Sequence, residues 1–158
     1  MSARVDLHIL TSQKTRPEWL EQAIASVTGQ PVTLRIIENT GRATGVGRAQ
    51  AYRESAAEFV ACLDDDDALL PGAIQACLDA LDANPSAIGA YTDAFYIDES
   101  GQVLGPDRST GSGPWTVERS LTGAGHTEHI AVMRRSAVLP FLDELESYTG
   151  MEQYFLHG

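Results

Sequence analysis

The amino-acid sequence predicts a single α/β domain over residues 1–158, in which helices flank a mostly parallel mixed sheet. Apolar runs of strand length alternate with segments whose apolar residues recur every three to four positions, and polar residues follow the strands directly. With 158 residues, 43% of them hydrophobic, the chain is long enough to bury one sizeable core. We find no internal repeat, no low-complexity segment and no second domain.

The first strand, helix and second strand form one unit. Residues 5–10 are apolar and predict a buried strand. Pro17 suits the first position of a helix, whose apolar positions recur until Gly29 ends it. Residues 32–37 predict the second strand. Because a helix separates the two strands, they are expected to be parallel.

The next part of the chain again alternates helix and strand, and its strand is short and strongly apolar. A glycine-containing loop leads into a helix over residues 46–57, and the strand follows at 59–63. Pro71-Gly72 opens a third helix, which Asn84-Pro85 ends. Strands that alternate with helices indicate a largely parallel sheet covered on both faces.

The rest of the chain predicts shorter elements. An aromatic stretch precedes a turn rich in Asp, Ser and Gly, which indicates a hairpin. A long polar tract and a second apolar stretch follow. The expected elements are a strand over 87–97, a turn over 98–101 leading into 102–104, a loop over 105–113, a short helix over 115–121, a strand over 128–133, and a helix up to 145 that Ser136 caps and Pro140 shortens or kinks.

Charge and composition exclude several classes of protein. Eleven Lys and Arg against 22 Asp and Glu give a net charge of −11, which argues against a broad nucleic-acid-binding surface. No apolar run approaches the roughly 20 residues that span a bilayer, and the N-terminus does not resemble a signal peptide, so we expect no membrane span and a cytoplasmic location. Cys62 and Cys77 are expected to be buried thiols.

Four consecutive carboxylates, Asp64 to Asp67, follow the strand over 59–63 directly. Neighbouring like charges repel by about a few kcal/mol at an effective dielectric near 20, so a cation is expected close by. Mg²⁺ and Mn²⁺ prefer carboxylate oxygens and commonly combine one or two of them with phosphate oxygens. The alternative is a solvated turn with an acidic helix start.

Other polar residues should meet this acidic run. In open parallel sheets, ligands bind outside the carboxyl ends of the strands, where Thr11, Glu38 and Asn39 also lie. Arg48, early in the second helix, can reach the same edge and pair with a phosphate. Several acids, one arginine and polar strand ends suit a metal-bound diphosphate beside a nucleoside.

Several short sequence blocks follow one another in a specific order and spacing. They are RPEWLEQAIASV at 16–27, ENTG at 38–41, GVGRAQ at 45–50, FVACLDDDD at 59–67 with LPG at 70–72, and YTD at 91–93 with IDESG at 97–101. In this order the blocks resemble those of family 2 glycosyltransferases, which have the GT-A fold. The resemblance is good over about residues 5–105 and weak beyond.

The resemblance implies a transferase of the hexosyl type (EC 2.4) that moves a sugar from a nucleoside diphosphate, with UDP favoured, to an acceptor hydroxyl with inversion. A divalent ion, Mn²⁺ or Mg²⁺, would offset the charge on the departing diphosphate. Matched position by position, the family's donor-site and metal-site residues correspond to residues within the first 93 positions of this sequence. Asp64 and Asp66 match the DxD acids, with Asp66 the direct metal ligand, and Asp65 or Asp67 would lie near the ribose or sugar. Thr11 and Glu38 would contact the nucleobase, Asn39 stands in place of an acid, and Arg48 matches the arginine at the donor. Asp93, beyond the fourth strand, would orient the donor sugar or the acceptor; the alternative is a carboxylate in a strand-end turn.

The remaining candidate site residues lie mainly toward the C-terminal part of the sequence. The family's general base follows a glycine, and here Gln153 occupies its position, so Glu152 is the candidate base. His157 could complete the metal shell. The alternatives are an exposed acid for Glu152 and a disordered terminus for His157. Four further side chains have open roles: His126 and His129 by the acceptor or metal, Trp115 stacked on a sugar or on the core, and His8 as a core residue.

Two other classes of protein share single features of this sequence. A dinucleotide-binding or P-loop protein fits poorly, because the chain has neither G-x-G-x-x-G nor G-K-[ST], and Lys14 is its only lysine. A non-catalytic or partner-dependent module that binds a nucleotide sugar or a divalent cation stays open, because the chain is short on the C-terminal, acceptor side. A homo-oligomer or another partner would then complete the acceptor site.

Overall fold

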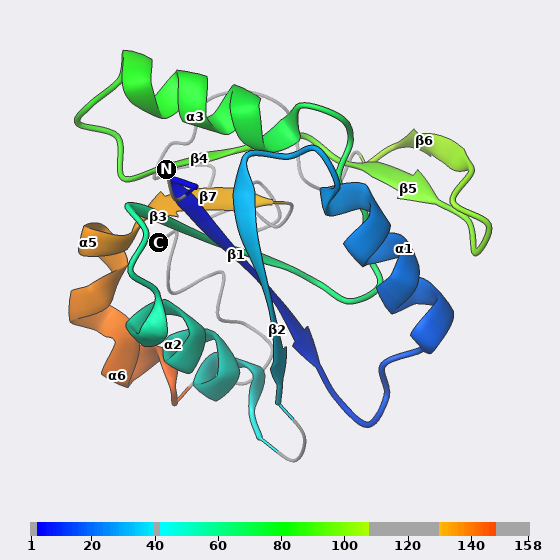
Figure 1. Ribbon diagram of the computed structural model, residues 1–158, viewed down its shortest axis with the longest axis horizontal. Coiled ribbons are helices and arrows are strands. Elements are labelled where there is room, and N and C mark those ends of the chain that lie inside the picture. The colour runs from blue at the N-terminus through cyan, green and yellow to red at the C-terminus, as the bar shows by residue number, and fades with distance from the viewer. Residues whose placement is uncertain (1–2, 40–41, 108–129, 148–158) are drawn as a thin grey trace.

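The computed structural model describes residues 3–39, 42–107 and 130–147 (Figure 1). A five-stranded sheet of order β2-β1-β3-β7-β4 forms its centre. β1 is parallel to both β2 and β3, whereas β7 is antiparallel to β3 and β4, so the predicted mixed sheet with a parallel core is confirmed. The strands are β1 Val5–Thr11, β2 Val32–Glu38, β3 Phe59–Leu63, β4 Gly89–Tyr91 and β7 Ala131–Arg134.

Helices cover both faces of this sheet, as expected for parallel strands joined by crossovers. One apolar cluster joins β1 and the side chains of Phe59 and Ala61 to α1 and α3, and the other joins Val60 to α2, α5 and α6. Successive residues of β3 therefore point to opposite faces. The helical elements are α1 Pro17–Val27, α2 Thr44–Glu54, α3 Ala73–Ala83, α5 Arg135–Val138, the 3₁₀ turn Leu139–Phe141 and α6 Leu142–Leu145.

Local sequence signals account for several helix ends. Pro17 occupies the first turn of α1, where its missing N–H costs no hydrogen bond. Gly72 directly precedes α3 with φ of 81°, a left-handed conformation that favours glycine. Predicted and observed bounds agree closely for α1 and α3, while α2 begins and ends two to three residues earlier than the range 46–57.

A two-stranded hairpin projects beside α1 and α3 (Figure 1). It pairs β5 Phe95–Ile97 with β6 Val103–Pro106 in antiparallel fashion. The carboxylate of Asp98 accepts hydrogen bonds from the backbone N–H groups of Ser100 and Gln102, both at 2.9 Å. The predicted turn over 98–101 is confirmed, and the side chain of Asp98 stabilises it.

Two predictions about the later elements are wrong. The single strand over 87–97 is divided, because β4 pairs with β7 in the main sheet whereas β5 pairs with β6. Ser136 lies inside α5 and does not cap it, since β7 passes into the helix without a loop and Arg134 takes the capping position. The predicted last strand is confirmed as β7, which begins at Ala131; residues 128–129 of the predicted range lie outside the described residues. Pro140 does interrupt the last helix, as predicted.

Other expectations concern single residues and membrane association. His8 is fully buried, as predicted, and Cys77 is a buried free thiol, whereas Cys62 is half-buried. Within the described ranges, no helix has the length and apolar character needed to cross a bilayer. The helix expected over 115–121 lies outside the described residues.

Candidate functional site

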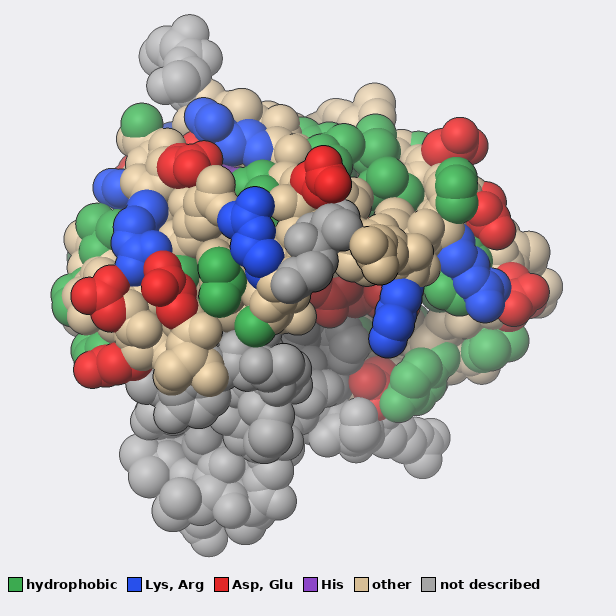
Figure 2. Space-filling view, turned by 90° about the horizontal axis from the view of Figure 1, so that it is seen from below, with side chains coloured by type: hydrophobic (Ala, Val, Ile, Leu, Met, Phe, Trp, Pro, Cys, Tyr) green, Lys and Arg blue, Asp and Glu red, His purple; other side chains and the backbone are tan. Residues whose placement is uncertain are grey.

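The ends of three parallel strands bring the predicted polar residues together. Thr11 and Glu38 are paired neighbours in the β1–β2 ladder, and Asp64 follows Leu63, whose partner in β1 is Ile9. The predicted convergence at one edge is therefore confirmed. Figure 2 looks onto this end of the sheet and shows acidic side chains recessed in a hollow, with basic side chains at its margin.

Arg48 and Asp64 form an ion pair at this edge. Arg48 lies one turn into α2, and its Nη2 donates to Asp64 Oδ1 at 3.0 Å. The guanidinium side chain is mostly buried, with 15% exposure, whereas that of Asp64 is 58% exposed. The protein thus holds the Arg48 guanidinium group in place beneath the Asp64 carboxylate, at a position that solvent, a metal ion or a phosphate can reach.

Asp65 ties the acidic run to the loop after β1. Its carboxylate accepts a hydrogen bond from Thr15 Oγ1, and the same hydroxyl accepts one from the backbone N–H of Ser12 at 2.7 Å. Thr15 is not among the site residues predicted from the sequence. Its signal was weak, because a threonine in a polar loop is common, and only the folded chain places it against an acid 50 positions away.

Asp66 has a raised pKa. Partial loss of hydration is the main cause, and the negative charge of Asp64 adds to it, followed by a smaller effect of Asp65. The carboxylates of Asp64 and Asp66 therefore lie close enough to interact electrostatically. A divalent cation between them would relieve this repulsion, and the donor set fits Mn²⁺ or Mg²⁺, which bind oxygen ligands.

In the described part of the chain, no group of three or more His, Cys, Asp or Glu residues is arranged so that it could hold a metal ion. Magnesium in nucleotide enzymes commonly uses one or two carboxylates, with phosphate oxygens and water completing the shell. Asp64 and Asp66 meet that smaller requirement.

Asn39 is buried and holds the turn that leads into α2. Its backbone N–H donates to Thr11 O at 2.8 Å, and its side-chain amide donates to Ala43 O at 3.2 Å. Gly47 permits this arrangement, because a Cβ there would lie 2.6 Å from the Asn39 side chain. Contact between Asn39 and a nucleotide stays a prediction, as does the contact predicted for Glu38.

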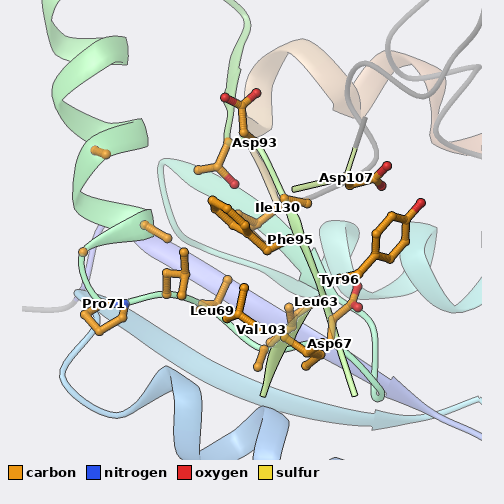
Figure 3. Close-up of a pocket in the computed structure, with 18 of the residues that line it drawn as sticks. Leu63, Asp67, Leu69, Pro71, Asp93, Phe95, Tyr96, Val103, Asp107 and Ile130 are labelled. Carbon is orange, nitrogen blue, oxygen red and sulfur yellow. The ribbon is translucent and has the colours of Figure 1, made fainter. Parts of the chain in front are cut away.

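Asp66 also lines a pocket between the start of α3 and the β5–β6 hairpin, which Figure 3 shows in close-up. It has a volume of about 440 Å³. Asp93, in the segment between β4 and β5, lines it together with Asp66, Asp67 and Asp107. The structure thus brings Asp93 to the same cavity as the acidic run, as expected for a residue beside the donor sugar or the acceptor.

Several predicted site residues lie outside the described residues. They are the candidate base Glu152, the candidate metal ligand His157, and Trp115, His126 and His129. Their roles stay predictions.

The described geometry combines an arginine, interacting carboxylates and strand-end polar groups at the carboxyl edge of a parallel sheet. Residues 11–138 match the family described as Glycosyl transferase family 2. The chain belongs to this family. The match begins at Thr11 and contains the whole acidic run, Arg48 and Asp93, whereas Glu152 and His157 lie beyond it.

Two solved structures are similar to this family 2 domain. One is CMP:2-keto-3-deoxy-manno-octonic acid synthetase complexed with CTP, with a TM-score of 0.54 and 12% identity, covering 97% of this chain and 82% of that one. The other is S. aureus TarS 1-349, with a TM-score of 0.55 and 12% identity, covering 99% of this chain and 54% of that one. At this identity they show the shared GT-A-like fold alone. No curated protein sequence matches the chain significantly.

Proposed function

We propose that this chain is a glycosyltransferase domain that binds a nucleoside-diphosphate sugar with Mn²⁺ or Mg²⁺ and transfers the sugar to an acceptor hydroxyl. The observation that carries the proposal is the Arg48–Asp64 pair beside Asp66 at the carboxyl ends of β1 and β3, within the region that matches family 2. An arginine and adjacent acids there supply both partners that a metal-bound diphosphate needs.

Asp64 and Asp66 would hold the metal ion, which would offset the charge that develops on the departing diphosphate. Arg48 would pair with a phosphate oxygen, because its buried guanidinium already points at this edge. The nucleoside would lie over Thr11, Glu38 and neighbouring Asn39. We favour uridine on the family resemblance.

Transfer with inversion also needs a base that takes the proton of the acceptor hydroxyl. We propose Glu152 for this step. Its Gln mutant would then lose transfer to a true acceptor but keep donor binding. Equal transfer by Glu152→Gln and wild type would remove Glu152 from the mechanism.

A thermal-shift screen tests the donor site. The full chain is heated with Mn²⁺ or Mg²⁺, with uridine, guanosine, thymidine or cytidine diphosphates, and with each combination; cytidine is included because the similar synthetase was solved with CTP. We expect stabilisation by one diphosphate only when metal is present, of about 2.7 kcal/mol at a ligand concentration 100 times Kd. No stabilisation by any combination would overturn the proposal.

Two arginines of α2 provide a matched pair for this screen. Arg48→Ala removes the guanidinium at the candidate site and should abolish or strongly reduce the shift produced by the metal and diphosphate. Arg53→Ala removes an exposed guanidinium that pairs with Asp143 and Glu146, and it should leave that shift intact. Binding without any turnover of nucleotide sugars would favour the binding-module alternative over the enzyme.

A further inference from the structure

The candidate metal ligands lie on a tight turn that follows β3. The backbone N–H of Asp67 donates to Asp64 O at 3.2 Å, so Asp65 and Asp66 occupy the corner of this turn. The residues alternate in exposure, because Asp64 and Asp66 are exposed whereas Asp65 is half-buried. The two acids that we assign to the metal ion are therefore open to solvent, while the acid between them is turned toward the protein.

Asp65 is anchored to the loop between β1 and α1. The hydroxyl of Thr15 in that loop donates a hydrogen bond to the Asp65 carboxylate. Because the acceptor is ionised, this bond belongs to the stronger class of protein hydrogen bonds. It joins the loop after β1 to the turn after β3, and both follow the carboxyl ends of neighbouring parallel strands.

Thr15 is itself fixed by a second turn, which does not involve Asp65. The backbone N–H of Thr15 donates to Ser12 O at 3.2 Å, and the N–H of Ser12 donates to the Thr15 hydroxyl oxygen at 2.7 Å. The N–H of Lys14 also donates to Ser12 Oγ, at 3.1 Å. A hydroxyl group has one hydrogen to donate, and here it is directed to Asp65. The loop thus sets the position of the hydroxyl, and the hydroxyl sets that of the acid.

Arg48 restrains the start of the same turn. Its Nη2 donates to Asp64 Oδ1 at 3.0 Å. Neither this ion pair nor the hydrogen bond from Thr15 involves Asp66. The position of Asp66 is therefore set by the turn, and the turn is anchored at Asp64 and Asp65.

Such anchors affect the affinity for a metal ion. Two carboxylates that are to share an ion repel each other before it binds. A protein that already holds them in place binds the ion more tightly, because binding then costs less conformational entropy. Without the anchor at Asp65, the turn could relax and let Asp64 and Asp66 move apart.

We propose that Thr15 is a positioning residue of the donor site, which fixes Asp65 and thereby the turn that presents Asp64 and Asp66 to the metal ion. Thr15 itself touches neither the metal ion nor the donor. The inference rests on the proposed function for the metal ion and the diphosphate, whereas the anchoring of the turn follows from the hydrogen bonds alone.

Isothermal titration calorimetry of the full chain tests this role. Binding of uridine diphosphate, or of the diphosphate that the thermal-shift screen selects, is measured over a series of Mn²⁺ concentrations. Thr15→Val replaces the hydroxyl with a methyl group of similar size. The Mn²⁺ concentration needed for half-maximal binding should rise about tenfold, because a charge-assisted hydrogen bond no longer holds the turn. Saturating Mn²⁺ should restore the affinity for the diphosphate, which would not happen if the variant had lost a nucleobase contact or its fold.

Three further variants complete the test. Thr15→Ser keeps the hydroxyl and should recover most of the metal affinity. Thr33→Val makes the same change at an exposed position near the start of β2, at the end of the strand opposite Glu38, and should match the wild type. Asp65→Ala should require at least as much Mn²⁺ as Thr15→Val, and adding Thr15→Val to it should have no further effect, because Thr15 acts through Asp65. Asp65→Ala also keeps the test open if Thr15→Val does not fold.

Four outcomes would overturn the inference. They are an equal Mn²⁺ requirement in Thr15→Val and wild type, a loss that saturating Mn²⁺ does not restore, a Thr15→Ser variant as weak as Thr15→Val, and a further loss in the double variant. Failure of the proposed function appears differently, as a wild type that binds no diphosphate or binds one regardless of metal, and it would remove the inference as well. The wild-type titration therefore distinguishes the two failures.

Discussion

The two ends of the central sheet differ in how their charged residues are paired. At the end where β1 and β3 begin, Arg4 binds Glu58 at 2.9 Å and Asp82 at 2.8 Å. Arg134, delivered there by the antiparallel strand β7, donates to the backbone carbonyls of Leu81 and Ala87. At this end, acids and guanidinium groups neutralise one another.

The end where β1 and β3 finish carries an excess of acid. Four consecutive aspartates follow β3, and Arg48 makes an ion pair with the first of them. Partial burial and, after it, the nearby charge of Asp64 raise the pKa of Asp66, so these two carboxylates lie close together in spite of their repulsion. The difference is what we expect if the charges at the first end stabilise the fold and those at the second hold the proposed metal ion and diphosphate.

The largest expected effect is loss of activity in Asp66→Asn. The variant keeps the shape of the side chain but weakens the metal ligand, so metal-dependent hydrolysis of a nucleotide sugar should fall by about 100-fold or more. Its melting temperature should not fall, because one repulsive charge is removed. Asp79→Asn is the control and should match the wild type in both measurements. A large loss of stability in Asp66→Asn would assign this acid to the fold instead.

Next in size is the effect of Arg134→Ala at the opposite end. The side chain is 22% exposed, donates to two carbonyls, and has its guanidinium carbon 5.2 Å from the centre of the Phe59 ring. Its loss should lower the free energy of unfolding by about 2–3 kcal/mol, the cost of losing hydrogen bonds from a charged donor. Urea denaturation measures this change.

Arg134→Lys completes that comparison. It keeps the charge but not the planar fork that reaches both carbonyls, so most of the loss should remain. Stabilisation by metal and nucleoside diphosphate should be the same in both variants and in the wild type. Weaker donor binding in Arg134→Ala would contradict the functional division between the two ends.

The sequence was sufficient to predict the core of the fold and the acidic edge. Strong apolar runs and helical spacing located β1, β3, α1 and α3, because burial of these segments is decided by their own pattern. It could not predict that residues 87–97 divide between two sheets. This division depends on strand pairing, above all on the pairing of β4 with β7, which is distant in sequence. The alternation of apolar and polar residues does not show which strands will pair.

The same reason limits what could be predicted about the site. Adjacent aspartates and a strand end were visible in the sequence, so the convergence of Thr11, Glu38 and Asp64 was predictable. The contact of Thr15 with Asp65 was not, because it depends on a loop conformation. Likewise, only the folded chain shows that Phe95 and Asp93 line one pocket.

The smallest expected effect concerns His8, which lies between the two ends. Its ring is fully buried, contacts Tyr52 edge-on at 5.9 Å between centroids, and has Nδ1 3.3 Å from Ala61 O. Burial lowers the pKa of His8, and this effect exceeds the opposing ones of the Ala61 carbonyl and of Asp6; Arg35 lowers the pKa slightly and Glu54 raises it.

Because the pKa of His8 is lowered in the folded state, the unfolded chain takes up a proton on this residue at a higher pH than the folded chain does. The neutral imidazole therefore contributes stability above the ordinary value of 6.5, and this contribution is lost as pH falls from there through the lower folded value. The expected slope is at most about 1.4 kcal/mol per pH unit, the limit for one proton. Urea denaturation of wild type and His8→Gln between pH 7.5 and pH 5, taken as about the range in which histidine titrates, measures it. The slope should be shallower in His8→Gln; an equal slope in both proteins would place the titrating group elsewhere and would leave the acidic edge as a candidate for pH-dependent stability.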